Sequence, residues 1–143
     1  MKFKIPLDIH EFDEGYHIHL EAKINDKPVK LVLDTGASKT VFDITQIKDI
    51  IEEAEYKEIN SLSVGIGTDT LTSYSIKINL FSIGKLEIEN FETVLIDMNI
   101  INDSYAKFNL PGIQGILGSD VLINYNANID LKKKVISFES PIK

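Results

Sequence analysis

The chain has 143 residues, of which 43% are apolar and 26% charged, and its net charge is −7. This size and mixture predict one globular domain over residues 1–143, and the acidic charge disfavours nucleic-acid binding because it repels phosphate backbones. All fifteen basic residues are Lys and Cys is absent, which excludes disulfides, Cys-based zinc sites, thiol nucleophiles and the bidentate anion clamps that Arg provides.

The first residues include Lys2 and Lys4, but no apolar run follows them, so we expect no signal peptide. No apolar stretch approaches the ~20 residues that a membrane-spanning helix needs. We therefore expect a cytoplasmic protein that has no membrane partner. Frequent Ile, Lys and Asn residues and the missing Arg indicate an AT-rich, bacterial gene.

A β-hairpin is predicted first along the chain. Residues 16–24 alternate between apolar and polar, and one face holds Tyr16, Ile18, Leu20, Ala22 and Ile24. A turn signal at 25–28 and a short apolar strand at 29–33 follow, so the hairpin ends at Asp34.

One longer segment is predicted to be helical, from about Ile44 to Tyr56. Its Ile and Ala residues recur at i, i+3 and i+4 spacing, which places them on one face. Asp43 is expected to cap this helix, with Gln46 at the third helical position as in a capping box.

Strand character returns from Ile59 and dominates the rest of the chain. We expect a hairpin tip near residues 65–69, strands at 72–81 and 85–97, and irregular structure over 99–115. A short buried strand at 116–118 then leads into a short helix, capped by Ser119 and running through Ile123. Residues 128–131 and 135–138 form a last hairpin around three lysines.

The residues that point to chemistry are Asp34-Thr35-Gly36, where an apolar strand runs directly into a carboxylate. Gly36 would let another backbone approach the carboxylate closely, and the Thr35 hydroxyl could lock the loop. Asp-Thr-Gly is also ordinary turn chemistry, so these three residues alone do not decide between a turn and a site.

Two further motifs follow Asp34-Thr35-Gly36-Ala37 in order: Gly65-Ile66-Gly67, and Ile116-Leu117-Gly118 before a short helix. Together with the tail at 124–131, this pattern resembles the single-domain, bacterial type of retropepsin-like aspartic protease over about residues 16–140. The resemblance implies an all-β fold: a closed acid-protease-like β-barrel with one main helix and a short helix after the second Gly motif.

The resemblance also implies roles for individual residues. Asp34 would be the catalytic carboxylate, Thr35 would interlock two active-site loops, and Gly118 would pack beneath the Asp34 loop. Gly36 and Ser38 would contact a peptide or protein substrate. The flap tip, which also contacts substrate, would be Gly65, Ile66, Gly67 and Thr68.

The number of carboxylates predicts the assembly. Peptide hydrolysis of this kind uses two aspartates that share one proton, and this chain has a single Asp-Thr-Gly. An aspartic endopeptidase would therefore need a homodimer that pairs Asp34 with its copy. Ala37 cannot donate a hydrogen bond to the carboxylate as a hydroxyl would, so we expect activity to peak at mildly acidic to neutral pH. No cofactor is expected.

One departure concerns the dimer. Retroviral members of the resembled group carry Arg after the second Gly, where it helps to hold the dimer together, but this chain has Ser119-Asp120. A non-catalytic peptide-binding or dimerisation module with the same fold is the alternative function.

The sequence offers three other candidate sites. His17 and His19 share a strand face with a metal-ligand spacing, but no carboxylate or thiol completes a set, so we expect solvated histidines at 10, 17 and 19 and no metal. Residues 65–68 lack the Gly-Lys-Ser/Thr of a phosphate loop, and Ser119 does not lie in a Gly-x-Ser-x-Gly elbow.

Overall fold

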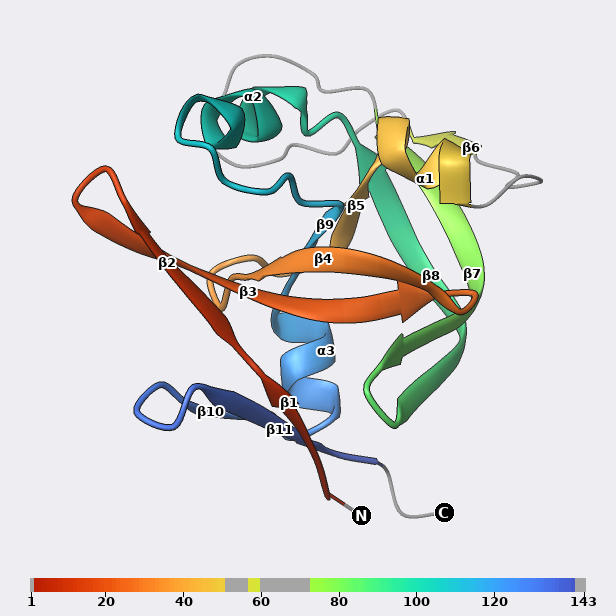
Figure 1. The fold of residues 1–143 in the computed structure, drawn as a ribbon. Coiled ribbons are helices and arrows are strands. Elements are labelled where there is room, and N and C mark those ends of the chain that lie inside the picture. Colours follow the sequence, from red (N-terminus) through yellow and green to blue (C-terminus); the bar gives the residue numbers. More distant parts are fainter. Residues whose placement is uncertain (1, 51–56, 60–72, 141–143) are drawn as a thin grey trace.

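The computed structural model describes residues 2–50, 57–59 and 73–140, and Figure 1 draws its strands around a central barrel. The strands are β1 (Lys2–Pro6), β2 (Asp8–Phe12), β3 (Gly15–Ile24), β4 (Lys27–Leu33), β5 (Val41–Asp43), β6 (Lys57–Ile59), β7 (Ser73–Ile83), β8 (Leu86–Ile96), β9 (Gly115–Leu117), β10 (Asn128–Asp130) and β11 (Val135–Glu139). The helices are α1 (Ile44–Ile50), α2 (Asn99–Lys107) and α3 (Ser119–Asn124). Among the described residues, no helix has the length and apolar character needed to cross a membrane.

Most strands belong to one sheet that closes on itself. Its order is β2-β3-β4-β9-β5-β8-β7-β6, and an additional antiparallel pairing joins β3 to β7. This pairing closes the six strands from β3 to β7 into a barrel, as the all-β prediction requires. A second sheet, β1-β11-β10, lies at the end of the molecule where both termini are found (Figure 1).

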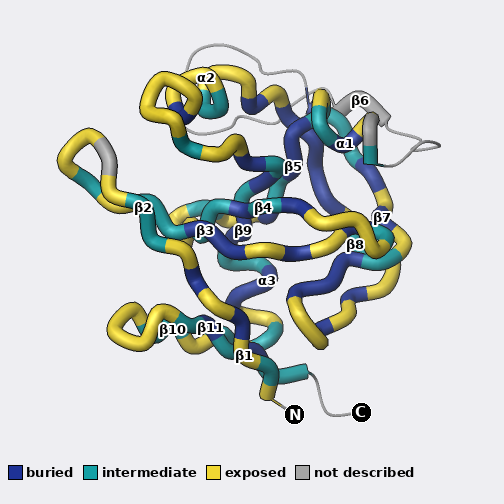
Figure 2. Tube along the Cα trace, viewed as in Figure 1, coloured by how far each residue is buried: buried dark blue, intermediate teal, exposed yellow. Residues whose placement is uncertain are grey.

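The barrel interior is the main hydrophobic core. Alternate residues of β3, β4, β7 and β8 point inward, and Figure 2 shows buried stretches alternating with intermediate and exposed ones along these strands. A smaller apolar cluster lies between α2 and the sheet, and its buried members are Val94, Ile96, Met98, Tyr105 and Ile113. This second cluster places α2 over the end of the barrel that carries residue 34.

The predicted hairpins are confirmed with small shifts in their bounds. Asn25 and Asp26, both with positive φ, connect β3 to β4 in a two-residue turn of the kind that suits the twist of paired strands. The β7–β8 and β10–β11 pairs also match the prediction. Strands β1, β2 and β5 were not predicted, and the expected hairpin tip at 65–69 lies outside the described residues.

The helices differ more from the prediction. Helix α1 begins at Ile44 as expected and is described to Ile50, while residues 51–56 lie outside the described part. Asp43 Oδ1 accepts the Thr45 backbone N–H at 3.3 Å, which is a helix cap. The reciprocal half of a capping box is absent, because the Asp43 N–H donates to the Gln114 carbonyl at 2.8 Å. Ser119 is not the cap of α3; Gly118 occupies that position without a side-chain bond.

Helix α2 occupies a segment predicted to be irregular. Its composition explains the error, because Asn, Asp and Ser compete with a helical backbone for hydrogen bonds. The helix is stabilised instead by contacts with distant segments: Tyr105 is buried, and the Asn102 side chain bonds both the N–H and the carbonyl of Ile113 at 2.7 and 3.0 Å.

Candidate active site

Asp34 lies directly after β4, at the start of a tight loop. The Gly36 N–H donates to Asp34 Oδ1 at 2.9 Å, and the Ala37 N–H donates to the Asp34 carbonyl at 3.2 Å. Asp34, Thr35, Gly36 and Ser38 are exposed. The loop therefore presents a carboxylate at the surface of the chain and holds its orientation through a local backbone donor.

The partner of β4 explains why the two sequence motifs meet. Strands β4 and β9 are parallel neighbours, and Val32 pairs with Ile116 and Leu33 with Leu117. Continued by one residue, this register places Asp34 beside Gly118. The Asp34 N–H donates to the Leu117 carbonyl at 3.1 Å. Two apolar strand ends that lie far apart in sequence thus form one edge of the site.

Gly118 lies against the backbone of the Asp34 loop. A Cβ at this position would be 2.7 Å from the Lys39 carbonyl carbon and oxygen and 2.9 Å from the Ala37 carbonyl oxygen. The adjacent Ser119 N–H donates to that Ala37 carbonyl at 2.8 Å. Glycine is needed here for the close approach of two backbones, since φ is an ordinary −101°.

A buried polar network fixes the far end of the loop. Thr40 is 1% exposed, and both its N–H and its hydroxyl donate to Asp120 Oδ1, at 2.9 and 2.8 Å. The same hydroxyl accepts the Gly118 N–H at 3.0 Å, and the Thr93 hydroxyl donates to the Thr40 carbonyl at 2.7 Å. These bonds connect β5, β8, β9 and α3 around the loop.

Sequence reasoning missed Thr40, Thr93 and Asp120 as supports of the site. Thr40 and Asp120 lie 80 residues apart, and neither belongs to a local pattern that announces a long-range bond. The one available signal was a polar residue next to each apolar strand, Thr40 before Val41 and Asp120 soon after Leu117.

A cavity of about 480 Å³ opens beside Asp34. The end of β3, the ends of β4 and β9, and helix α2 form its walls. Its lining is mainly apolar: Tyr16, His17, Ile18, Val32, Leu33, Asp34, Ile100, Ile101, Ser104, Tyr105, Ile113 and Ile116. Such a lining with a few polar groups suits an apolar side chain of a ligand that passes Asp34.

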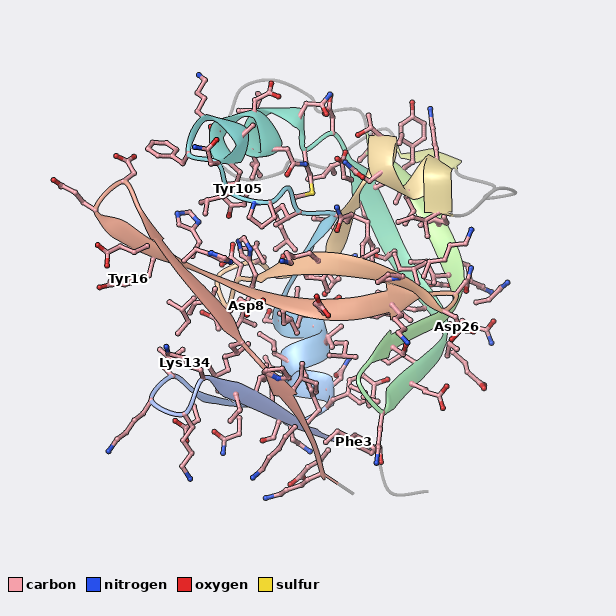
Figure 3. The ribbon with its side chains drawn as sticks, viewed as in Figure 1. Phe3, Asp8, Tyr16, Asp26, Tyr105 and Lys134 are labelled. Atoms are coloured by element: carbon pink, nitrogen blue, oxygen red, sulfur yellow. The ribbon has the colours of Figure 1, made fainter. Side chains whose placement is uncertain are left out.

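The expectation of solvated histidines is wrong for His19, which is fully buried. The reason is α2, whose Tyr105 covers this part of β3 (Figure 3). Burial, followed by the positive charges available to His10, Lys30 and His17, lowers the pKa of His19 to about 4, although Asp8 acts in the opposite direction. Tyr16 is also unlike its prediction, since it is 69% exposed at the cavity rim.

Two histidine nitrogens inside the fold have no hydrogen-bond partner. They are His10 Nε2 and His19 Nδ1, and the centres of the two rings are 4.8 Å apart. Within residues 2–50, 57–59 and 73–140, no group of three or more His, Cys, Asp or Glu side chains is arranged to hold a metal ion.

The remaining candidate residues of the flap tip, Gly65, Ile66, Gly67 and Thr68, lie outside the described residues. Their assignment stays a prediction from the sequence.

Comparison with known proteins gives a family. The model of the family described as "Aspartyl protease" matches residues 20–121, which include the Asp34 loop, β9 and Gly118. No curated protein matches the chain.

Solved structures give the fold. A retropepsin-like aspartic protease from Rickettsia conorii has 18% identity and a TM-score of 0.57, and the match covers 96% of this chain and 89% of that chain. The retroviral protease-like domain of Ddi1 from Leishmania major has 17% identity and a TM-score of 0.56, with coverage of 86% and 88%. The EIAV protease, solved with the inhibitor HBY-793, has 18% identity and a TM-score of 0.52, with coverage of 80% and 92%. The barrel is thus of the retropepsin-like kind.

Proposed function

This chain belongs to the aspartyl protease family, and from that membership we propose that it is an aspartic endopeptidase whose working unit is a homodimer. The observation that carries the proposal is the position of Asp34. Its carboxylate is exposed on a loop that backbone and side-chain bonds hold in place, at the mouth of an apolar cavity.

The need for a second chain follows from the reaction. Hydrolysis of a peptide bond by carboxylates requires one group to take a proton from water and another to protonate the carbonyl oxygen. The chain has one Asp-Thr-Gly, and Asp34 is the only acidic residue that lines the cavity among the described residues. A two-fold axis beside the loop would supply the second group as Asp34 of the other copy, and the two would share one proton.

The chemical steps then divide between the two carboxylates. The ionised one accepts a proton from the water as the water oxygen attacks the carbonyl carbon. The protonated one donates to the carbonyl oxygen, which gives a neutral gem-diol intermediate. In the second step the carboxyl that holds the proton donates it to the amide nitrogen, while the ionised carboxylate takes a proton from a hydroxyl of the gem-diol. The C–N bond breaks, the acid and amine products leave, and the pair again shares one proton.

Other loop residues have supporting roles in this proposal. Thr35 is exposed and available to meet the equivalent loop of the second copy. Gly36 and Ser38 would contact the substrate backbone. Gly118 supports the loop from beneath, because only a glycine allows the observed approach to Ala37 and Lys39. The flap residues Gly65 to Thr68 are proposed on the sequence resemblance alone.

The substrate would be an extended peptide. Such a peptide presents side chains alternately to opposite sides, and the cavity between Asp34 and α2 would take one apolar side chain. We therefore expect cleavage next to apolar residues.

The test is Asp34→Asn, which keeps the shape of the side chain and removes its acid–base chemistry. The matched control is Asp26→Asn, at an exposed turn whose positive φ suits Asn. A peptide library digested by the wild type and the control, but not by Asp34→Asn, supports the proposal. Equal cleavage by all three proteins would refute it, and an absence of cleavage by the wild type with retained peptide binding would favour the non-catalytic module.

The dimer has its own test. Free exchange of wild type with an equal amount of Asp34→Asn places about half of the wild-type chains in mixed dimers without a working pair. The activity should therefore fall to about half, whereas mixing with Asp26→Asn should not lower it. Activity that is unaffected by Asp34→Asn, or an active species with the mass of one chain, would rule out a shared pair.

A further inference from the structure

A second cavity, of about 470 Å³, opens at the surface between β1 and β3. Its floor is apolar, and Ile5 and Ala22 in that floor are only 5% and 4% exposed. Four charged side chains surround the floor: Lys4, Asp8, Glu21 and Lys23. This groove shares no lining residue with the cavity beside Asp34, so it is a separate site.

The groove lies where one side of β3 is incompletely paired. Strand β2 pairs with β3 as far as Asp8 opposite His19, and β7 pairs with β3 from Lys23 opposite Ser82. No described strand pairs with this side of β3 at Glu21, which lies between those two pairings. The chain before Asp8 belongs to β1, which pairs with β11 in the second sheet (Figure 1). One backbone position of the barrel wall is therefore left open.

The backbone of Glu21 faces this gap. A two-residue turn joins β3 to β4, and the residues that flank such a turn, Ile24 and Lys27 here, exchange backbone hydrogen bonds. Backbone groups of successive residues point to opposite sides of a strand, so those of Glu21 point away from β4. The Asn25 N–H lies on the same side and donates to the Leu80 carbonyl of β7 at 2.9 Å. An extended ligand in the gap can thus add to β3 through one N–H and one C=O.

The charges around the groove are ordered along β3. Glu21 and Lys23 are two residues apart, so their side chains leave the same face of β3 at points about 6.6 Å apart. Asp8, opposite His19, lies on the far side of Glu21 from Lys23 and extends the acidic end. When the register of β2 on β3 is continued past Asp8, Lys4 falls at the level of Lys23 and adds to the basic end. Within the described residues, none of these four charges belongs to an ion pair.

An acidic end and a basic end above an apolar floor suit a ligand that carries both charges itself. A peptide with free ends has an ammonium group at one end and a carboxylate at the other. Because an extended chain spans at most ~3.3–3.6 Å per residue, two or three residues span about 7–10 Å. This length matches the distance along β3 from the acidic end to the basic end. A single amino acid is too short to reach both ends.

We propose that this groove binds a di- or tripeptide with free ends. Its ammonium group lies beside Asp8 and Glu21, and its carboxylate lies beside Lys4 and Lys23. Its backbone lies along β3 and exchanges hydrogen bonds with Glu21. The proposal does not depend on hydrolysis at Asp34, because no residue of that site lines the groove.

The first experiment is an NMR titration of the wild type with dialanine, followed through the backbone amide signals. The matched probes are N-acetyl-dialanine, which lacks the ammonium group, dialanine amide, which lacks the carboxylate, and alanine, which is too short. We expect the signals of Glu21, Ala22 and Gly84 to shift with dialanine. Because each charged end meets two exposed side chains of opposite sign, blocking either end should weaken binding about fivefold. Equal affinity for the three peptides, or shifts confined to the Asp34 loop, would overturn the proposal.

The second experiment assigns each end of the peptide to its side chains. Glu21→Gln should weaken binding of dialanine about threefold and leave N-acetyl-dialanine unaffected, because that peptide has no ammonium group to lose a partner. Lys23→Gln should weaken dialanine to the same extent and leave dialanine amide unaffected. All of these positions are exposed, so the fold should be retained.

The matched controls are Glu92→Gln and Lys77→Gln, exposed residues that face each other on β8 and β7 and do not line the groove. They change the net charge of the protein in the same way, and we expect the affinity for dialanine to stay unchanged. An equal loss in the controls would show a general effect of net charge and overturn the proposal. So would a Glu21→Gln variant that loses affinity equally for dialanine and N-acetyl-dialanine.

Discussion

The structure gives its most specific prediction of lost stability for Gly118→Ala. The added methyl group would lie 2.7 Å from two backbone atoms of Lys39 and 2.9 Å from the Ala37 carbonyl oxygen, where ordinary contacts are 3.4 Å or more. These atoms belong to backbone and cannot rotate away. The loop or β9 must move by about 0.7 Å to relieve the contact.

The magnitude follows from what that movement disturbs. Overpacking costs about 1–3 kcal/mol, and weakening the Ser119–Ala37 and Gly118–Thr40 hydrogen bonds adds up to about 1 kcal/mol each. Because φ is −101°, alanine adopts this backbone conformation without strain. Alanine also lowers the conformational entropy of the unfolded chain, which raises the free energy of unfolding by ~0.4–1 kcal/mol. The net expectation is a loss of roughly 2–3 kcal/mol in the free energy of unfolding.

The assay is urea unfolding at fixed protein concentration, since association with a second copy would raise the apparent stability. With a slope of about 1–3 kcal/mol per molar, the midpoint should fall by roughly 1–2 M. The control is Gly112→Ala, whose methyl group would meet, among the described residues, the Asn102 side chain at 3.3 Å and no backbone atom. An unfolding midpoint of Gly118→Ala that matches the wild type would refute the reasoning. Peptide cleavage should fall along with stability, because the Asp34 loop is displaced.

Three further predictions concern single side chains. Thr40→Val should lower the free energy of unfolding by about 2–3 kcal/mol, because the Gly118 N–H and Asp120 lose a buried partner. Thr40→Ser keeps a hydroxyl and should retain most of that free energy. Equal chemical denaturation curves for the two variants would contradict this prediction. His19→Gln should change the pH dependence of stability. In the wild type, His19 binds a proton near pH 6.5 in the unfolded chain but only near pH 4 in the folded chain. The free energy of unfolding therefore rises with pH across that window, by up to about 3 kcal/mol. A His19→Gln variant whose stability has the same slope against pH as the wild type would refute this prediction. Lys2→Met should alter the melting temperature by no more than about 2 °C, because the exposed ion pair with Glu139 at 3.7 Å contributes little; a larger drop would show that the β1 edge depends on it.

The strands and hairpins could be predicted from local patterns, whereas the closed barrel and the position of Gly118 beneath the Asp34 loop were implied only by the resemblance to retropepsin-like proteases. Alternation marked β3, turn residues marked the hairpins, and two apolar runs each ended at a motif residue. Helix α2 could not be predicted in this way. Its sequence favours caps and turns, and what stabilises it is the burial of Tyr105 and the bonds of Asn102 to a segment 11 residues away.

The burial of the histidines also depends on an element that is distant in the sequence. The alternation of β3 assigns His17 and His19 to a polar face, which is correct as a statement about the strand. Whether that face meets water depends on α2, which comes 80 or more residues later and was itself not predicted. The prediction for Tyr16 fails for the opposite reason: it lies beside the turn between β2 and β3, where no element of the described part of the chain covers it.

The parallel pairing of β4 with β9 also has a consequence for the order in which the site can form. The bonds from Lys30 to Gln114, from Thr40 to Asp120 and from Gly118 to Thr40 span 84, 80 and 78 residues. During synthesis, the segment that carries Asp34 is made long before β9 and α3, so the loop lacks their stabilising hydrogen bonds at that stage. Closing connections of this length is slow compared with forming hairpins. The carboxylate therefore takes up its position only after β9 and α3 have been made, so the proposed proteolysis could begin only after that stage of synthesis.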